Sequence, residues 1–489
     1  MNDTDIAIIG GGIGGLAAAW NIILTARQKN PSAVPRITVL EASDRFGGNV
    51  DTFDFTFGNG PDGTIDRWAD LGVNDFNVTA YTNIVAVMNQ IGFKAGTDYL
   101  PLEDSTSYST GDGSICFTDS ASAWWGTAID KALAASVNDF MQVAGVDATK
   151  NAGKFATTTI SEYIDMVGPT RSPPWDARLG PQVIYPRING MYFVTELGPR
   201  GMPFLAVMHY YAIQEGAGGK PANRCYFVGG ASRWINQLVA YMTATMPEIT
   251  FVQNYRASAS LEDGLFTISN DLAPTLQPFR AKKLVLAAHA DSSLIAVKQG
   301  LPGEVASAMA SIEYTNGISV AHTDSRLLPV NCNAWSTYNI LIHQPGAVAQ
   351  MPYTINYVAN RHQNDAQNPF YDKFGYPLFF VSVNPYRPIP DDLVLKDAQG
   401  NRAVQNLRHN ILDFATLQAQ AVCLKNQGVN GIYYAGGWTQ GAGLHEECWV
   451  QGQDVAKLIL GETEHHEKLK ALDFAELAGA RLHRNMQPG

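Results

Sequence analysis

The chain has 489 residues, of which 46% are hydrophobic and 16% are charged, and its formal net charge is −11. A chain of this length exceeds the size at which one hydrophobic core stops growing, so we expect two interleaved domains or one large domain with inserts. The ordinary composition excludes disordered and fibrous classes, and the acidic balance excludes a nucleic-acid binder, which needs a dense basic surface.

The cysteines and the N-terminal residues bear on the compartment. The five cysteines are scattered, odd in number and never in CxxC spacing, which predicts neither a disulfide framework nor a zinc site. The chain passes into an apolar run at Ile6 without the basic region and cleavage site of a secretory signal, and no apolar run reaches the length of about 20 residues that spans a bilayer. These features favour a cytoplasmic protein without a transmembrane segment; peripheral membrane contact through the C-terminal tail stays open.

The first elements predict a strand, a glycine turn, a helix and a second strand. The apolar run 5–9 leads directly into glycines, small helix-forming residues continue to about Arg27, and a second strand covers 36–41. This order is one βαβ unit, and it indicates an α/β fold with a Rossmann-like domain.

The glycines of this unit have the spacing GxGxxG. The first permits a tight turn, the second lets a pyrophosphate approach the backbone, and the third allows close packing of the helix on the strand. The helix start offers partial positive charge to phosphates, and Glu41 at the end of the second strand can accept hydrogen bonds from a ribose hydroxyl while disfavouring the 2′-phosphate of NADP. The residues predicted to bind the dinucleotide here are Gly10, Gly12, Ile13, Gly14, Gly15, Glu41 and Ala42.

Two further motifs, one near each end of the chain, point to a family. Glu41 opens Glu-x-x-x-Arg-x-Gly-Gly, in which Arg45 can neutralise a pyrophosphate and Gly47 and Gly48 allow backbone beside the cofactor. The segment 434–438 through 452–456 has the pattern of a closing motif. Together they resemble the flavin-containing amine oxidase superfamily, which includes monoamine oxidases, protoporphyrinogen oxidases and phytoene-type desaturases. The resemblance implies bound FAD, whose flavin end would meet Gly436, Gly437, Leu444 and His445.

The rhythm of strands and helices suggests that the FAD-binding domain is assembled from distant pieces. We expect residues 1–75, 226–300 and 426–462 to form it, residues 76–225 and 301–425 to form an inserted α+β substrate domain, and residues 463–489 to form a surface helix or tail.

A second resemblance concerns the substrate. The segments 288–294, 322–324 and 443–446 resemble a bacterial subgroup of predicted NAD/FAD-binding proteins linked to fatty acyl modification, and this implies a small apolar substrate. Aromatic side chains could line an apolar tunnel over the flavin or simply pack in a core. The candidates are Trp335, Tyr338, Trp438 and Trp449, and the first three are the predicted substrate residues.

Two features count against amine oxidation. Amine oxidases of this superfamily commonly hold a lysine near the flavin, but the stretch 299–372 contains none. Counting back from Gly452, the position of a tyrosine in the aromatic cage falls on Leu444.

His445 and Glu446 are the candidate catalytic residues, because the closing motif places them near the flavin and histidine titrates near neutral pH. The alternative for His445 is a hydrogen bond that only orients the ring. For His289, and for His322 with Asp324, a structural role is favoured. No cluster has metal-ligand spacing and no Gly-x-Ser-x-Gly is present, which argues against metal catalysis and hydrolysis.

The sequence therefore predicts an FAD-dependent oxidoreductase that takes hydride from a mostly apolar substrate and introduces a double bond. Three alternatives stay open: an amine or amino-acid oxidase, a redox-neutral double-bond isomerase, and a non-enzymatic protein that binds a lipid-bearing partner.

Overall fold

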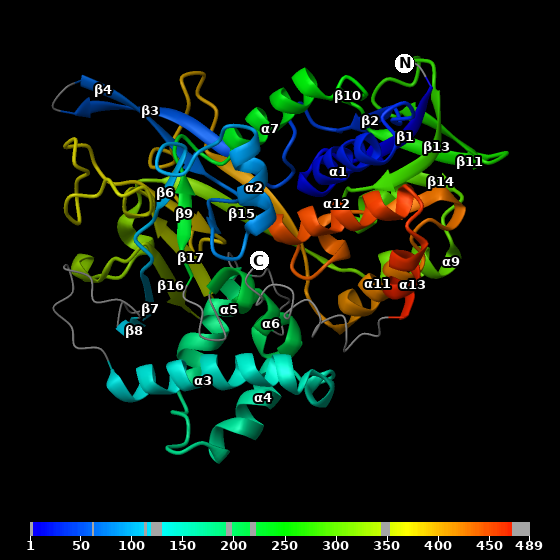
Figure 1. Cartoon of the computed structure of the whole chain (residues 1–489). Coiled ribbons are helices and arrows are strands. Elements are labelled where there is room, and N and C mark those ends of the chain that lie inside the picture. Colours follow the sequence, from blue (N-terminus) through cyan, green and yellow to red (C-terminus); the bar gives the residue numbers. More distant parts are fainter. Residues whose placement is uncertain are drawn as a thin grey trace.

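The computed structural model describes residues 3–60, 63–111, 115–118, 130–191, 198–215, 222–343 and 353–471. In this part of the chain the strands form two large sheets and two small ones. Figure 1 shows the first large sheet beside the N-terminus, the second sheet on the opposite side, and a group of helices beneath the second sheet. The mixed α/β architecture confirms the predicted fold class.

The first large sheet holds the predicted βαβ unit. Its strand order is β10, β2, β1, β13, β12, β11 and β14, and β20 pairs with the carboxyl-terminal half of β13. In chain order the strands are β1 (Thr4–Ile9), β2 (Ile37–Leu40), β10 (Ile249–Val252), β11 (Ala257–Glu262), β12 (Leu265–Asn270), β13 (Phe279–Leu286), β14 (Val297–Gln299) and β20 (Ile432–Tyr434).

Strand β1 lies at the centre of this sheet, parallel to β2 and β13. It is an almost uninterrupted apolar run because helices cover both faces of a parallel sheet. Helix α1 (Ile13–Lys29) follows the glycine turn and packs along α12 (His445–Ile459). A Cβ at Gly452 would lie 2.7 Å from Ala17, so these helices approach at backbone distance. The first and last segments of the chain thus share one core.

The second large sheet has the strand order β19, β15, β18, β17, β16, β7 and β8. In the chain, β7 and β8 come before strands β10 to β14 of the first sheet, and β15 to β19 come after them. Its strands are β7 (Thr106–Thr110), β8 (Ile115–Thr118), β15 (Tyr314–His322), β16 (Tyr338–Ile342), β17 (Tyr353–Val358), β18 (Phe380–Val383) and β19 (Val404–Asn410). Alternate residues of β16 face opposite sides. Tyr338 and Ile340 face a cavity, whereas Asn339 lies in a buried polar layer with Ser107 and Asn356.

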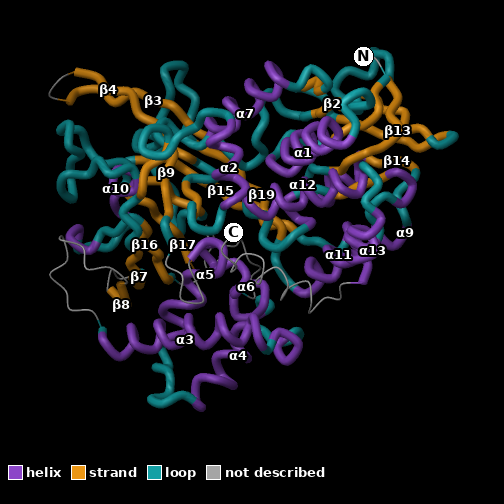
Figure 2. The backbone as a smooth tube through the Cα atoms, in the orientation of Figure 1, coloured by secondary structure: helices purple, strands orange, loops and turns teal. Residues whose placement is uncertain are grey.

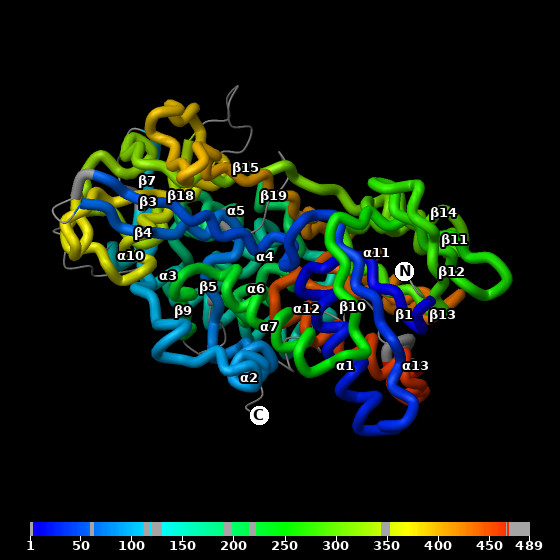
Figure 3. Tube along the Cα trace, turned by 90° about the horizontal axis from the view of Figure 1, so that it is seen from above, coloured from blue at the N-terminus to red at the C-terminus, as the bar shows by residue number. Residues whose placement is uncertain are grey.

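Two small sheets complete the strands. The hairpin β3 (Thr52–Gly60) and β4 (Gly63–Asp70) packs on residues of the second large sheet such as Val381, and Figure 3 shows it from above running along that side of the molecule. Strand β9 (Arg224–Phe227) lies between β5 (Asp75–Asn77) and β6 (Tyr99–Pro101) in a sheet of its own, next to the second large sheet.

Four of the remaining helices form one group. Figure 2 shows α3, α4, α5 and α6 gathered beneath the second sheet, where they share a core with Tyr108, Ile340 and Ile355. The helices are α2 (Thr82–Gln90), α3 (Lys131–Lys150), α4 (Ile160–Val167), α5 (Tyr185–Met191), α6 (Phe204–Tyr210), α7 (Ser232–Thr245), α8 (Ala290–Ala296), α9 (Gly303–Ala310), α10 (Ala359–His362), α11 (Phe414–Lys425) and α13 (Thr463–Ala471). Of the expected tail at 463–489, the part after residue 471 lies outside the described residues. Among the described helices, none is both long and apolar enough to cross a bilayer.

Candidate cofactor and substrate site

The glycine turn after β1 brings three backbone segments together. A Cβ at Gly14 would lie 1.8 Å from the carbonyl oxygen of Ala435, and one at Gly15 would lie 2.0 Å from that of Gly10. Gly10 itself has a φ of +110°, and its Cβ would lie 2.6 Å from the backbone of Ala287. These positions exclude a side chain for packing reasons, because helix α1 starts in contact with neighbouring strands.

Gly12 differs from these glycines, because a Cβ there would meet only the backbone of Gly48, no closer than 3.8 Å. It is the N-cap of α1 and has no side chain to bond the first N–H groups of the helix. Those N–H groups and the helix dipole favour an anion. The space between Gly12 and Gly48 is therefore a cradle that glycine leaves open and in which a phosphate group would fit.

Glu41 anchors the turn at the end of β2. Its Oε2 accepts a hydrogen bond of 2.8 Å from the N–H of Gly11, and its Oε1 accepts from the N–H and the hydroxyl of Ser43, each at 2.8 Å. Glu41 and Ala42 also line the cavity. Because a carboxylate offers about four lone-pair sites, Glu41 can still accept a hydrogen bond from a ribose hydroxyl.

One cavity of about 560 Å³ connects this turn with the second sheet. At one end lie Glu41, Ala42, Tyr255 and Arg256. The cavity then passes the glycine cradle, and at the other end it reaches strands β16 and β17. Its lining includes most of the predicted dinucleotide residues, namely Gly10, Gly12, Ile13, Gly14, Glu41, Ala42, Gly47, Gly48, Gly437, Leu444 and His445.

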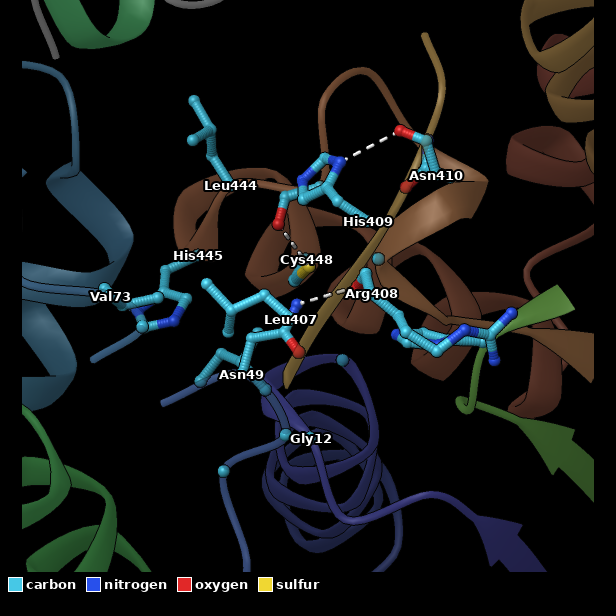
Figure 4. Close-up of a pocket in the computed structure, with 18 of the residues that line it drawn as sticks. Gly12, Asn49, Val73, Leu407, Arg408, His409, Asn410, Leu444, His445 and Cys448 are labelled. Atoms are coloured by element: carbon cyan, nitrogen blue, oxygen red, sulfur yellow. Dashed lines mark hydrogen bonds between the residues drawn. The ribbon is translucent and has the colours of Figure 1, made fainter. Parts of the chain in front are cut away.

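Strand β19, at the edge of the second sheet, crosses the cradle. Figure 4 shows Leu407, Arg408 and His409 above Gly12 at the start of α1. Asn49 fixes this crossing, because its Nδ2 donates to the carbonyl oxygen of Arg408 at 3.3 Å. Arg408 lines the cavity and forms an ion pair of 2.6 Å with Asp291. Nothing in the spacing of these distant residues indicated that they would meet.

Arg45 was expected to neutralise a pyrophosphate, but its guanidinium is turned toward its own loop. It donates to the carbonyl oxygens of Gly48, at 3.0 Å, and of Val50, and lies 3.7 Å from Asp51. Arg45 therefore braces the loop that holds Gly48 against the cradle, and it does not line the cavity as described.

The closing motif delivers α12 to the cavity. Gly437, Leu444 and His445 line it, whereas Gly436 packs behind, where a Cβ would lie 2.6 Å from the carbonyl oxygen of Ala288. His445 is buried beside Trp234, with ring centroids 5.8 Å apart. Burial lowers the pKa of His445 to about 4, so its imidazole is neutral at physiological pH.

The prediction of Glu446 as a catalytic residue is not supported by its position. Its carboxylate accepts hydrogen bonds of 3.0 Å from the backbone N–H groups of Asn83 and Ile84, and one of 2.6 Å from the Asn83 amide. It is buried and satisfies the first turn of α2. Burial raises its pKa while these hydrogen bonds oppose the shift. Glu446 is a helix cap because α12 starts against the N-terminus of α2.

The predicted aromatic tunnel is divided. Tyr338 and Trp438 line the cavity. Trp335 instead donates from Nε1 to the carbonyl oxygen of Pro329 at 2.8 Å in a separate core, and Trp449 packs on Trp20 with centroids 6.0 Å apart. An aromatic residue in a core and one at the cavity give the same sequence pattern, so the sequence could not tell which of the four line the cavity.

Of the other histidines, His289 lines the cavity and stacks on Tyr314, with centroids 4.9 Å apart. His322 is the fully buried last residue of β15, and its Nε2 lies 2.7 Å from the hydroxyl of Ser382 on the neighbouring strand β18. Burial lowers the pKa of each of these histidines to about 4.

The far end of the cavity carries a polar cluster that the sequence did not reveal. Asp75 of β5 accepts hydrogen bonds from Tyr338 of β16, at 2.6 Å, and from the amide of Gln214, at 2.8 Å. Tyr81 and Arg224 line the same end. Asp75 and Tyr338 are 263 residues apart in the chain, and only the pairing of distant strands brings them together.

The N-terminal part matches a known family. Residues 8–91 match the NAD(P)-binding Rossmann-like domain. None of the curated proteins matches the chain significantly.

Solved structures match nearly the whole chain. Cyclohexylamine oxidase from Brevibacterium oxydans IH-35A is similar at 14% identity and a TM-score of 0.59, covering 94% of this chain and 100% of that one. Wild-type putrescine oxidase bound to putrescine is similar at 13% identity and a TM-score of 0.57, covering 94% and 99%.

The chain has the flavin amine oxidase fold. This confirms, at the level of the fold, the resemblance that the motifs at its two ends predicted.

Proposed function

We propose that this protein is an FAD-dependent oxidoreductase that removes hydride from a mostly apolar organic substrate and leaves a double bond. The observation that carries the proposal is the single cavity that connects the glycine cradle of the Rossmann-like domain with the strands of the second sheet. A dinucleotide in the cradle and a substrate against the second sheet would then lie in one continuous space.

The residues at the cradle fit FAD. Glu41 would accept from the ribose, the open space between Gly12 and Gly48 would receive the pyrophosphate, and Gly437 with Leu444 would border the flavin. When bound, FAD supplies a hydride acceptor, which no side chain provides.

The second sheet supplies the apolar part of the cavity. Ile340, Ile355 and Val383 project into it from β16, β17 and β18, and Leu407 closes it from β19. These side chains exclude water and favour an apolar substrate by area burial. His445 is neutral at physiological pH, so its ring offers one hydrogen-bond donor and one acceptor to a bound group.

Amine oxidation is the second candidate, because two similar solved structures are a cyclohexylamine oxidase and a putrescine oxidase. Two positions of this chain favour the first proposal. Leu444, which lines the cavity, occupies the expected position of a cage tyrosine and cannot stack on an amine as tyrosine does. The described residues of the cavity lining also include no lysine.

The test is an anaerobic titration of the purified protein, followed by the flavin absorbance at about 450 nm. We expect a yellow protein whose absorbance bleaches with an apolar acyl or hydrocarbon substrate and not with amines of the same chain length. Bleaching by amines alone would replace the first proposal by amine oxidation. Product with a moved double bond and no net bleaching would indicate an isomerase, and a colourless protein that takes up no FAD would contradict the enzymatic proposal.

A further inference from the structure

The polar end of the cavity is organised around a buried carboxylate. Asp75 is only slightly exposed, and its two oxygens accept hydrogen bonds from the Tyr338 hydroxyl and the Gln214 amide. The three groups come from β5, β16 and the π-helical turn Tyr211–Glu215, and all of them line the cavity. A buried carboxylate is costly unless it is well satisfied, so this arrangement fixes the orientation of its neighbours.

The direction of the hydrogen bonds is the same throughout the cluster. The Tyr81 hydroxyl donates to Oε1 of Gln214 at 2.9 Å, and Gln214 donates from Nε2 to Asp75 at 2.8 Å. Tyr338 also donates to Asp75, at 2.6 Å. An ionised carboxylate only accepts, so both phenol protons point inward, directly or through the amide. The phenol oxygens of Tyr81 and Tyr338 therefore keep lone pairs for a ligand, and a ligand group bound to them must donate.

A positive charge is already present beside this carboxylate. The Arg224 guanidinium lies 4.6 Å from the ring centroid of Tyr338, and it also binds Asp104. Nε2 of His362 lies 3.7 Å from Asp75. Burial raises the pKa of Asp75, but Arg224 and the hydrogen bonds outweigh it and hold the pKa below its ordinary value. A ligand ammonium would meet both the repulsion of Arg224 and the attraction of Asp75 and Asp104, and on burial it would lose its hydration, which costs far more than burying a hydroxyl.

We infer that Tyr81, Tyr338 and Gln214, set by Asp75, bind a neutral hydroxyl group of an otherwise apolar substrate. This inference rests on the proposed function for the identity of the cavity as a substrate site. A hydroxyl carries one proton, which either phenol oxygen can accept, and it loses much less hydration on burial than an ammonium does. A carboxylate has only acceptor oxygens, so it cannot donate to the phenol oxygens of Tyr81 and Tyr338. The buried acceptors then stay unpaired, which lowers the affinity.

The experiment compares hexanol, hexylamine and hexanoate by isothermal titration calorimetry on the purified protein. These probes share one alkyl chain and differ in a group that is neutral and donating, cationic, or anionic. We expect hexanol to bind at least about tenfold more tightly than hexanoate, and more tightly than hexylamine. Tyr81→Phe and Tyr338→Phe should each weaken hexanol about three- to tenfold and leave hexanoate unchanged.

Tyr163→Phe is the matched control, because the Tyr163 hydroxyl also donates to a carboxylate, that of Asp147 at 2.8 Å, but lies on α4 away from the cavity. It should change none of the three affinities. The inference is overturned if hexanoate or hexylamine binds as tightly as hexanol, or if the phenylalanine variants weaken all three ligands equally. Calorimetry does not depend on flavin reduction, so hydroxyl binding by a protein without FAD would overturn the proposed function alone.

Discussion

Nε2 of His209 lies 2.7 Å from Oε1 of Glu447, and both side chains are buried. The other carboxylate oxygen of Glu447 accepts from the backbone N–H groups of Ala442, at 3.1 Å, and Leu444, at 3.0 Å. One carboxylate therefore connects α6, beneath the second sheet, with the turn that places Leu444 in the cavity. The helices beneath the second sheet and the start of α12 are held together at this residue.

Glu447→Gln should destabilise the fold. The amide group cannot accept at both of its ends, so either the backbone N–H groups or His209 lose a buried acceptor. We expect the free energy of unfolding to fall by about 2–3 kcal/mol in urea denaturation. Glu464→Gln, at an exposed position of α13, is the control and should change it by less than about 0.5 kcal/mol. Equal unfolding midpoints for the two variants would contradict the role given to Glu447.

Gly12 and Gly14 should respond differently to alanine. The Cβ of Gly12→Ala meets only the backbone of Gly48, no closer than 3.8 Å, and Gly12 has an ordinary φ of −70°, so the fold should tolerate the change. Its methyl group occupies the cradle, and we expect the variant to purify folded but with at least about tenfold weaker FAD retention. Gly14→Ala places Cβ 1.8 Å from the carbonyl oxygen of Ala435 and should prevent folding.

Circular dichroism and the flavin content after gel filtration measure these two outcomes. Gly303→Ala is the control, because a Cβ there meets nothing within 4 Å. A Gly12→Ala protein that keeps full FAD would show that the cradle does not hold the pyrophosphate.

Local patterns explain what the sequence could predict. The strand, glycine turn and helix of the first unit depend on neighbours in the chain, and the structure places them at β1 and α1. The close approaches at Gly14 and Gly15 follow from the same spacing, since a fixed helix start brings the same positions against the strands. The motif at 434–456 could be matched for the same reason.

Long-range packing explains what it could not. The closing motif brings Glu446 close to the cavity. Adjacent residues of a helix face different directions, however, so His445 lines the cavity while Glu446 faces the N-terminus of α2. Trp335 and Tyr338 are both aromatic and only three positions apart. Trp335 lies in a core and Tyr338 lines the cavity, and this difference depends on how β16 packs against its neighbours. Asp75 and Gln214 have no sequence signal, because their meeting depends on the pairing of segments far apart in the chain.

His445 should contribute a pH-dependent part of the stability. Its pKa is lowered from 6.5 to about 4 by burial, so the folded state binds a proton less readily than the unfolded state. The contribution is fully present above pH 6.5 and is lost as the pH falls toward 4, by up to about 3 kcal/mol. His445→Gln should lose less stability than the native chain over that window, measured by urea denaturation at each pH. Parallel pH profiles for the two proteins would show that His445 is solvated or paired in the folded state.

Asp70 should have the opposite dependence on pH. It is the buried last residue of β4, next to the start of α7, and it accepts from the Thr52 hydroxyl and, at 2.9 Å, from the N–H of Ala231. Burial raises its pKa from 3.8 to about 7. The folded state therefore binds the proton more tightly, and the resulting stability is fully present below pH 3.8 and lost as the pH rises through 7.

Asp70→Asn resembles the protonated side chain at every pH. It should be nearly equal to the native chain at about pH 3.5, where the native carboxyl is protonated in the folded state and mostly protonated in the unfolded state, and more stable than it by about 4 kcal/mol at about pH 8. Urea denaturation at the two pH values measures the difference, with the exposed Asp66→Asn as the control. If Asp70→Asn were less stable at the higher pH, the ionised carboxylate and its hydrogen bonds to Thr52 and Ala231 would outweigh the cost of burying the charge.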